Sequence, residues 1–182
     1  HGMAQTYNNL GLVYADKGEW DKAIAFYQNA LKTMERVGDV HGMAQTYNNL
    51  GLVYADKGEW DKAIAFYQQS LETKERVGDV QGMAQTYNNL GIVYRQKGEW
   101  AKAIAFYQKS LETTERLGDV VTSANNYWGL GSVYEKQKDI SHAFEFCNRA
   151  MSVWEKLKSP YAKTYHAHLQ ELKQKLARAS EE

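Results

Sequence analysis

Large apolar residues recur along the chain at the spacing of an α-helix. Between residues 43 and 57 they stand three or four positions apart, at Met43, Tyr47, Leu50 and Tyr54. A second series begins after a short polar interval and comprises Trp60, Ile64, Tyr67, Leu71 and, less regularly, Val77. Spacings of three and four place such residues on one face of a helix, whereas a strand needs strict alternation. The pattern therefore predicts two amphipathic helices in succession.

Glycine and aspartate mark the ends of these helices. Gly58 follows the first apolar series, and Gly78 follows the second. Glycine readily adopts the left-handed backbone conformation that commonly ends a helix. Asp79 comes next, and its carboxylate is suited to accept hydrogen bonds from the free amides at the start of another helix. The same Gly-Asp pair stands at 38–39 and 118–119, so we expect one helix to end and another to begin at each pair.

The two predicted helices form one unit of an internal repeat. A shift of 40 places residues 1–40 on residues 41–80, and only positions 29, 30, 32 and 34 differ. Residues 81–120 keep the same frame, and residues 121–159 keep it with many substitutions. A period of this length is typical of stacked supersecondary units, so we predict one continuous domain of four repeats with these boundaries. Copies this similar arise by recent duplication or by engineering, and both origins stay open.

A final helix is predicted in residues 160–182. Ser159 and Pro160 suit a helix start, because serine caps free amides and proline fits a first turn. One apolar stripe follows, made of Tyr161, Tyr165, Leu169, Leu172 and Leu176. Polar residues cover the rest, as a terminal element of a repeat stack requires, so we predict a C-terminal capping helix. The first repeat has no such cap, and because the pattern is already running at His1, we expect the chain to come from a longer array.

The order of residues within each unit resembles the tetratricopeptide repeat. In the second unit the matching residues are Tyr47, Leu50, Gly51, Tyr54, Gly58, Trp60, Ala63, Tyr67, Ser70 and Leu71. Gly51 and Ala63 allow two helices to approach closely, and the aromatic residues fill gaps between neighbouring hairpins. The resemblance covers residues 1–160. It implies an all-α fold, namely a right-handed αα superhelix (solenoid) of four helix-turn-helix repeats plus the capping helix.

The unit is longer than the common one of roughly 34 residues. Residues 75–83 replace the usual proline with a longer second helix, the Gly-Asp pair and an extra turn. Such units are similar to those of kinesin light chains, spindle-polarity adaptors and bacterial peptide-pheromone receptors. The resemblance therefore implies that the partner is a protein or a peptide and that the chain is an interaction scaffold.

In tetratricopeptide proteins the first helix of each pair lines the concave surface, so the resemblance implies ligand contacts there. The candidates are residues of these helices that lie off the apolar stripe, with two further positions in the fourth repeat. They are Gln5, Asn8, Asn9, Leu12, Gln45, Asn48, Asn49, Leu52, Asp56, Gln85, Asn88, Asn89, Ile92, Arg95, Gln96, Trp128 and Lys136. No cofactor is expected.

Paired asparagines recur in three of these helices, at 8–9, 48–49 and 88–89. They resemble the asparagines with which kinesin light chains and pheromone receptors hold a peptide backbone. A carboxamide both donates and accepts, so it can pair with the amide and the carbonyl group of an extended peptide. Alternatively, one asparagine of each pair bonds to a neighbouring helix. Trp128 and Gly129 replace the pair in the fourth repeat, where Trp128 is either an aromatic anchor for a ligand or part of the core.

Charge changes along the same helices. Asp16 and Asp56 of the first two repeats become Gln96 in the third and Lys136 in the fourth. This change would orient a bound peptide, but exposed charges contribute only about 0–1 kcal/mol each. The lysine and asparagine of the chaperone-tail clamp are absent, because the corresponding residues of the second repeat are Asn48 and Leu52. Chaperone tails are therefore not expected as ligands.

Composition narrows the class of partner. The chain of 182 residues has 22 Lys and Arg against 22 Asp and Glu, so its net charge gives nucleic acid or an anionic membrane little attraction. No apolar run approaches the roughly 20 residues that cross a bilayer. Cys147 is the only cysteine, which excludes an internal disulfide. We predict a cytoplasmic protein that binds neither nucleic acid nor membrane.

Catalytic and metal sites are not indicated. His166 and His168 are two residues apart, on nearly opposite sides of a helix, so they are poorly placed to share a metal. His142 and Cys147 are five residues apart and also face different directions. The glycines stand inside or between helices and form no phosphate-binding motif. We therefore predict that the chain is not an enzyme.

Two functions remain open from the sequence. The first is a scaffold that binds an extended peptide or partner segment in the concave groove. The second is a structural or self-associating array, natural or engineered, in which the uncapped face of the first repeat mediates oligomerisation. The capping helix at the other end would limit such growth to paired N-terminal faces.

Overall fold

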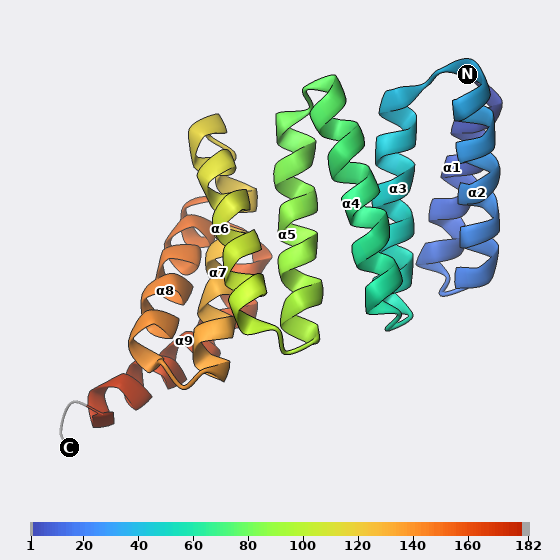
Figure 1. Ribbon diagram of the computed structural model, residues 1–182. Coiled ribbons are helices and arrows are strands. Elements are labelled where there is room, and N and C mark those ends of the chain that lie inside the picture. Colours follow the sequence, from blue (N-terminus) through green and yellow to red (C-terminus); the bar gives the residue numbers. More distant parts are fainter. Residues whose placement is uncertain (1, 180–182) are drawn as a thin grey trace. The chain divides into compact units, whose positions relative to one another are not determined.

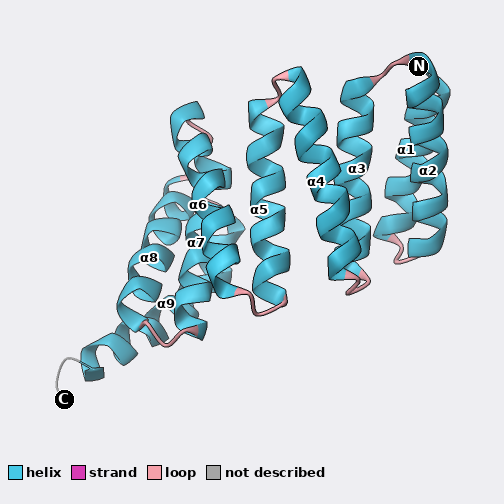
Figure 2. Cartoon of the chain, in the orientation of Figure 1, coloured by secondary structure: helices cyan, strands magenta, loops and turns pink. Residues whose placement is uncertain are grey.

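The computed structural model describes residues 2–179, and within them the chain forms nine helices and no strand (Figures 1 and 2). The all-α, helical-repeat fold predicted from the apolar spacing is therefore confirmed. The helices are α1 (Gly2–Asp16), α2 (Trp20–Val37), α3 (Val40–Asp56), α4 (Trp60–Val77), α5 (Val80–Gln96), α6 (Trp100–Leu117), α7 (Val120–Lys136), α8 (Ile140–Lys156) and α9 (Pro160–Ala179). The chain divides into two compact units between Asn89 and Leu90, inside α5.

The predicted helix ends are confirmed in their local geometry. Gly38, Gly78 and Gly118 have φ of +70°, +72° and +71°, the left-handed conformation in which glycine carries no steric penalty. Asp39 and Asp119 each accept a hydrogen bond from a backbone amide three residues further on, at 2.9 and 3.0 Å. Gly-Asp therefore ends one helix and caps the next.

The fourth repeat keeps this backbone without the glycine. Lys138 has φ +64° and Lys158 has φ +52°, at positions where the preceding repeats carry glycine. A side chain in this conformation crowds the following carbonyl group. The fourth repeat is therefore strained at both of its turns.

In each of the first three repeats, a glycine of the first helix packs against a tyrosine ring of the second helix. A Cβ atom at Gly11, Gly51 or Gly91 would lie 2.5–2.7 Å from the nearest ring atom of Tyr27, Tyr67 or Tyr107, respectively. These three tyrosines are 1 % exposed. The small residue is therefore required for the aromatic core of each hairpin, as the sequence indicates. In the fourth repeat Cys147 occupies the tyrosine position and packs against Gly131.

The last helix closes the second unit. Leu169 and Leu172 of α9 are 7 % and 0 % exposed, and they pack in one cluster with Cys147 and Met151 of α8. Tyr161, at the start of the predicted stripe, stays 48 % exposed. The capping helix is thus held mainly by its central leucines.

Candidate functional site

The first asparagine of the first pair lies between repeats. Asn8 is 7 % exposed, and its carboxamide oxygen lies 3.2 Å from the Thr46 hydroxyl and 3.3 Å from the Asn49 side-chain nitrogen. Both partners donate to it from α3. The Asn49 oxygen accepts in turn from the Gln45 carboxamide at 3.2 Å, so both groups of the Asn49 side chain are used inside the protein.

The same bonds recur one repeat later. Asn48 is also 7 % exposed, and its oxygen accepts from the Thr86 hydroxyl at 3.2 Å and from the Asn89 side chain at 3.3 Å. Asn9 is exposed, while Asn88 and Asn89 are half-buried. Asn8 and Asn48 therefore bond to the next first helix, which is the alternative that the sequence left open for one asparagine of each pair. Contact of any of these asparagines with a ligand stays a prediction.

Other candidates on α1 and α3 are open to solvent. Leu12 and Leu52 occupy the same position in the two repeats and are each 41 % exposed, although leucine is usually buried. The polar candidates on these helices, Gln5, Gln45 and Asp56, are exposed as well. On α5, Gln85 is exposed and Ile92 is half-buried.

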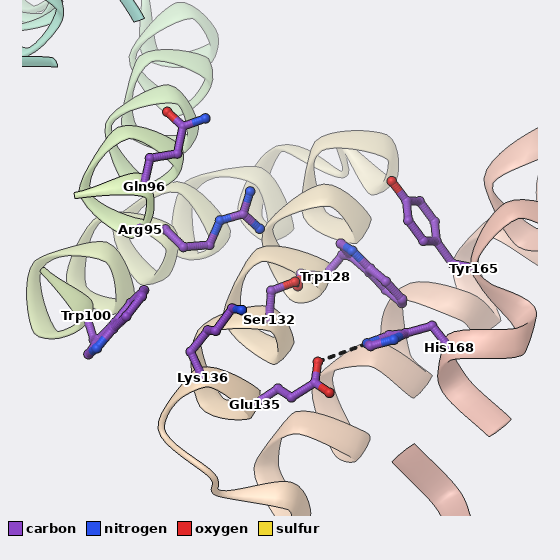
Figure 3. A pocket seen from close by; sticks show the side chains of 9 residues that line it. All are labelled: Arg95, Gln96, Trp100, Trp128, Ser132, Glu135, Lys136, Tyr165 and His168. Carbon is purple, nitrogen blue, oxygen red and sulfur yellow. Dashed lines mark hydrogen bonds and ion pairs between the residues drawn. The ribbon is translucent and has the colours of Figure 1, made fainter. Parts of the chain in front are cut away.

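The second unit contains a pocket of about 560 Å³ (Figure 3). Four predicted site residues line it, namely Arg95, Gln96, Trp128 and Lys136. Five further lining residues were not among the sequence candidates, and these are Trp100, Ser132, Glu135, Tyr165 and His168. The pocket is formed by the end of α5, the start of α6, the second half of α7 and the middle of α9.

Trp128 belongs both to the core and to this pocket. Its ring centroid lies 4.3 Å from that of Tyr165, 5.4 Å from that of Trp154 and 5.5 Å from that of His168. The half-buried indole also lines the pocket. The two alternatives for Trp128 are therefore compatible, since packing against α8 and α9 fixes the ring that the pocket presents.

Glu135 of α7 forms ion pairs with two side chains of α9 at the wall of the pocket. One of its carboxylate oxygens lies 3.0 Å from His168 Nε2, and the other lies 3.1 Å from Lys175 Nζ. Figure 3 shows the bond between Glu135 and His168 at the edge of the pocket. Glu135 is the one acidic side chain among the described residues that line the pocket, and both of its oxygens are thus bound by side chains of α9.

A comparison of repeats identifies part of this pocket. Trp128, Ser132, Glu135 and Lys136 stand where the third repeat has Asn88, Ile92, Arg95 and Gln96, so each is a departure from the repeated pattern. Tyr165 and His168 lie in the capping helix, which has no repeat equivalent. They come to the pocket through the docking of α9, which the apolar stripe of the capping helix indicates for Tyr165 but not for His168.

Cys147 and His142, the two residues considered for nucleophilic catalysis, have other environments in the structure. Cys147 is fully buried, and burial raises the pKa of its thiol to about 12, so the thiol is protonated at neutral pH. His142 Nδ1 lies 2.7 Å from Asp139 Oδ2 at the start of α8. Among residues 2–179 no three His, Cys, Asp or Glu side chains are grouped as metal ligands would be. In the same range no helix is both long enough and apolar enough to cross a membrane.

Known structures share this arrangement of helices. BtubC (BKLC) from P. vanneervenii is 26 % identical, with a TM-score of 0.77 over 85 % of this chain and 64 % of its own. The apo form of RapI gives a TM-score of 0.84 at 17 % identity, over 97 % of this chain and 49 % of its own. Aspartyl phosphate phosphatase F from Bacillus subtilis gives 0.84 at 16 % identity, over 93 % and 44 %. The chain thus spans less than two thirds of the length of each protein.

No curated protein matches the sequence. The family model described as "Tetratricopeptide repeat" matches residues 2–76 and 82–167, which is most of the chain. These matched ranges include the helix hairpins with their Gly-Tyr contacts and reach the middle of α9. The resemblance noted in the sequence is therefore confirmed, and the chain belongs to the tetratricopeptide repeat family.

Proposed function

We propose that the chain binds an extended peptide segment of a partner protein along the first helices of its repeats. Tetratricopeptide repeats in general form scaffolds for protein interactions and are typically not catalysts. The observation that carries the proposal is the repeated exposure of Leu12 and Leu52, at 41 % each. Apolar side chains exposed at one repeated position offer a row of contacts to the side chains of an extended ligand.

Polar groups beside these leucines support the same proposal. Gln5 and Asn9 are exposed on α1, and Gln45 is exposed on α3. Carboxamides pair with a peptide backbone whatever the ligand's side chains are. The buried bonds of Asn8 and Asn48 hold the first helices in register, so the exposed groups are positioned before a ligand arrives. A protein in the cytoplasm, with no catalytic role and no nucleic-acid partner, remains part of this proposal.

The test is selection of peptides from a random display library, with the double variant Leu12→Ser/Leu52→Ser beside the unaltered protein. Full burial of a leucine contributes about 1.5–3 kcal/mol, so burial of the exposed 41 % contributes about 1 kcal/mol per residue. The double variant should therefore lose about 2 kcal/mol of binding, or roughly thirtyfold in Kd.

A matched control removes exposed apolar surface elsewhere. Val37 and Leu117 are 42 % and 48 % exposed at the ends of second helices, so Val37→Ser/Leu117→Ser should bind selected peptides as the unaltered protein does. Circular dichroism confirms that each variant keeps its helix content. Equal weakening by both double variants, or no selection of peptides at all, would refute the proposal.

A second candidate function, self-association through the first repeat, is favoured by a different observation. Leu10 and Val13 of α1 are 36 % and 47 % exposed, whereas the equivalent Leu50 and Val53 of α3 are 0 % and 2 % exposed beneath α2. An apolar face that is covered in one repeat is therefore open in the preceding one. Light scattering over a wide range of concentration tests this candidate, which predicts a dimer that the substitution Val13→Lys dissociates. A monomer at every concentration would exclude it.

A further inference from the structure

The pocket of the second unit carries positive charge without an acidic partner. Arg95 is half-buried and Lys136 is exposed, and neither forms an ion pair with a carboxylate among the described residues. Glu135 does not neutralise them, because its two oxygens are bound by His168 and Lys175. Figure 3 shows Arg95 and Lys136 extending from α5 and α7 on the side of the pocket that also holds Ser132. An anionic group there would meet two cations and a hydroxyl donor.

The walls of the pocket are flat and aromatic. Trp100 stands on one side, and Trp128 with His168 and Tyr165 stands on the other (Figure 3). Contacts among the last three fix their orientation, with the Trp128 centroid 4.3 Å from that of Tyr165 and 5.5 Å from that of His168. Rigid aromatic walls favour a planar group by stacking, in addition to the contribution of the area that is buried.

The first two repeats lack the two cations and the second aromatic wall, although Trp20 and Trp60 stand where the third repeat has Trp100. Where Lys136 stands in the fourth repeat, the first two carry Asp16 and Asp56. Where Trp128 stands, they carry Asn8 and Asn48, whose side chains join neighbouring helices. Arg95, Lys136 and Trp128 therefore appear together only where the repeat pattern is broken, beside a tryptophan that the first three repeats share.

We propose that this pocket binds a small planar aromatic anion, with its ring between Trp100 and Trp128 and its charged group at Arg95 and Lys136. A volume of about 560 Å³ lies within the range of roughly 300–1,000 Å³ that small-molecule sites occupy. The site is distinct from Leu12 and Leu52 of the first unit, so its ligand would be bound in addition to the proposed peptide. Its occupation would also change the surface near α9, since Tyr165 and His168 belong to that helix.

Three probes of the same shape test the charge requirement: 2-naphthoate, neutral 2-naphthamide and the cation of 2-naphthylmethylamine. Binding is measured by isothermal titration calorimetry at low ionic strength, and the indole N–H signals of Trp100 and Trp128 are followed by NMR. The naphthoate should bind at least about tenfold more tightly than the amide, because its charge meets two cations in a partly desolvated site. The cation should not shift either indole signal.

Two double variants separate the pocket from the general charge of the protein. Arg95→Ala/Lys136→Ala should abolish the preference for naphthoate over naphthamide. The control Arg116→Ala/Lys163→Ala removes the same charge from exposed positions outside the pocket and should keep the preference. Equal binding of the three probes, no shift of the Trp100 and Trp128 signals, or equal effects of the two double variants would overturn the proposal. Peptide selection by Leu12 and Leu52 would stand in each of these cases.

Discussion

Replacement of Lys74 by methionine is expected to stabilise the protein at neutral pH. Lys74 is 2 % exposed in α4, and its ammonium group donates to the Gly82 carbonyl oxygen at 3.0 Å and to the Thr86 hydroxyl at 2.8 Å. Neither acceptor is charged. The equivalent residue of the first repeat is Met34, which is equally buried, so this position accommodates methionine in nearly the same sequence context.

The magnitude follows from the opposing contributions. Removal of the ammonium group recovers a desolvation penalty of several kcal/mol. It also removes two hydrogen bonds from a charged donor, which offset part of that penalty. Gly82 and Thr86 are not orphaned, because the Thr86 hydroxyl also lies 3.1 Å from the Gly82 oxygen. We expect a net gain of about 1–2 kcal/mol in the free energy of unfolding, within the range seen when buried charges are replaced by apolar residues.

The gain should shrink as the pH rises. Burial lowers the pKa of Lys74, which the negative charge of Asp79 partly opposes. The unfolded chain keeps a lysine pKa of about 10.4, so it binds more protons than the folded protein at pH values between the two pKa values. The unaltered protein therefore becomes more stable relative to Lys74→Met as the pH approaches 10. Tyr27 and Tyr107, whose pKa values burial raises to about 12, are common to both proteins and cancel in the difference.

Urea unfolding followed by circular dichroism, at about pH 7, 8.5 and 9.5, measures this difference. Lys32→Met is the matched control, because Lys32 is exposed on α2, and its effect should be small at every pH. A loss of stability in Lys74→Met, or a gain that does not change with pH, would refute the assignment of a net cost to the buried ammonium group.

Three further substitutions, the first with a control variant, test other parts of the fold. Asn48→Ala should cost about 1–2 kcal/mol because it removes the acceptor between repeats, while Asn9→Ala, at an exposed position, should leave the urea midpoint nearly unchanged. Lys138→Gly should raise the free energy of unfolding by about 1 kcal/mol, and with it the urea midpoint, because it relieves a left-handed residue at φ +64°. Tyr107→Phe should stabilise by up to about 1 kcal/mol, because the Tyr107 hydroxyl is buried without a hydrogen-bond partner among the described residues. A lower midpoint in either of the last two would contradict its premise.

The sequence predicts the helix ends because their determinants are local. The left-handed conformation of Gly78 and the cap from Asp79 to the Gly82 amide, at 2.8 Å, lie within five consecutive residues. The spacing of Leu and Tyr residues likewise predicts the hairpins. The burial and hydrogen bonding of Asn8 depend instead on Thr46 and Asn49. These residues are 38 and 41 positions away in the sequence and contact Asn8 only when two repeats stack. A single repeat does not contain that information.

The pocket was predicted only in part for a related reason. Identical repeats place identical residues at every position, so recurrence alone does not separate a ligand contact from a packing contact. Departures from the repeat do carry information, and in the fourth repeat they are of two kinds. Lys138 replaces the glycine of a left-handed turn and keeps its backbone angle, at φ +64°. Trp128 and Lys136 replace an asparagine and the aspartate or glutamine of earlier repeats, and together they line one pocket. Convergence on a common pocket therefore distinguishes Trp128 and Lys136, which we propose to serve binding, from Lys138, which lies outside that pocket.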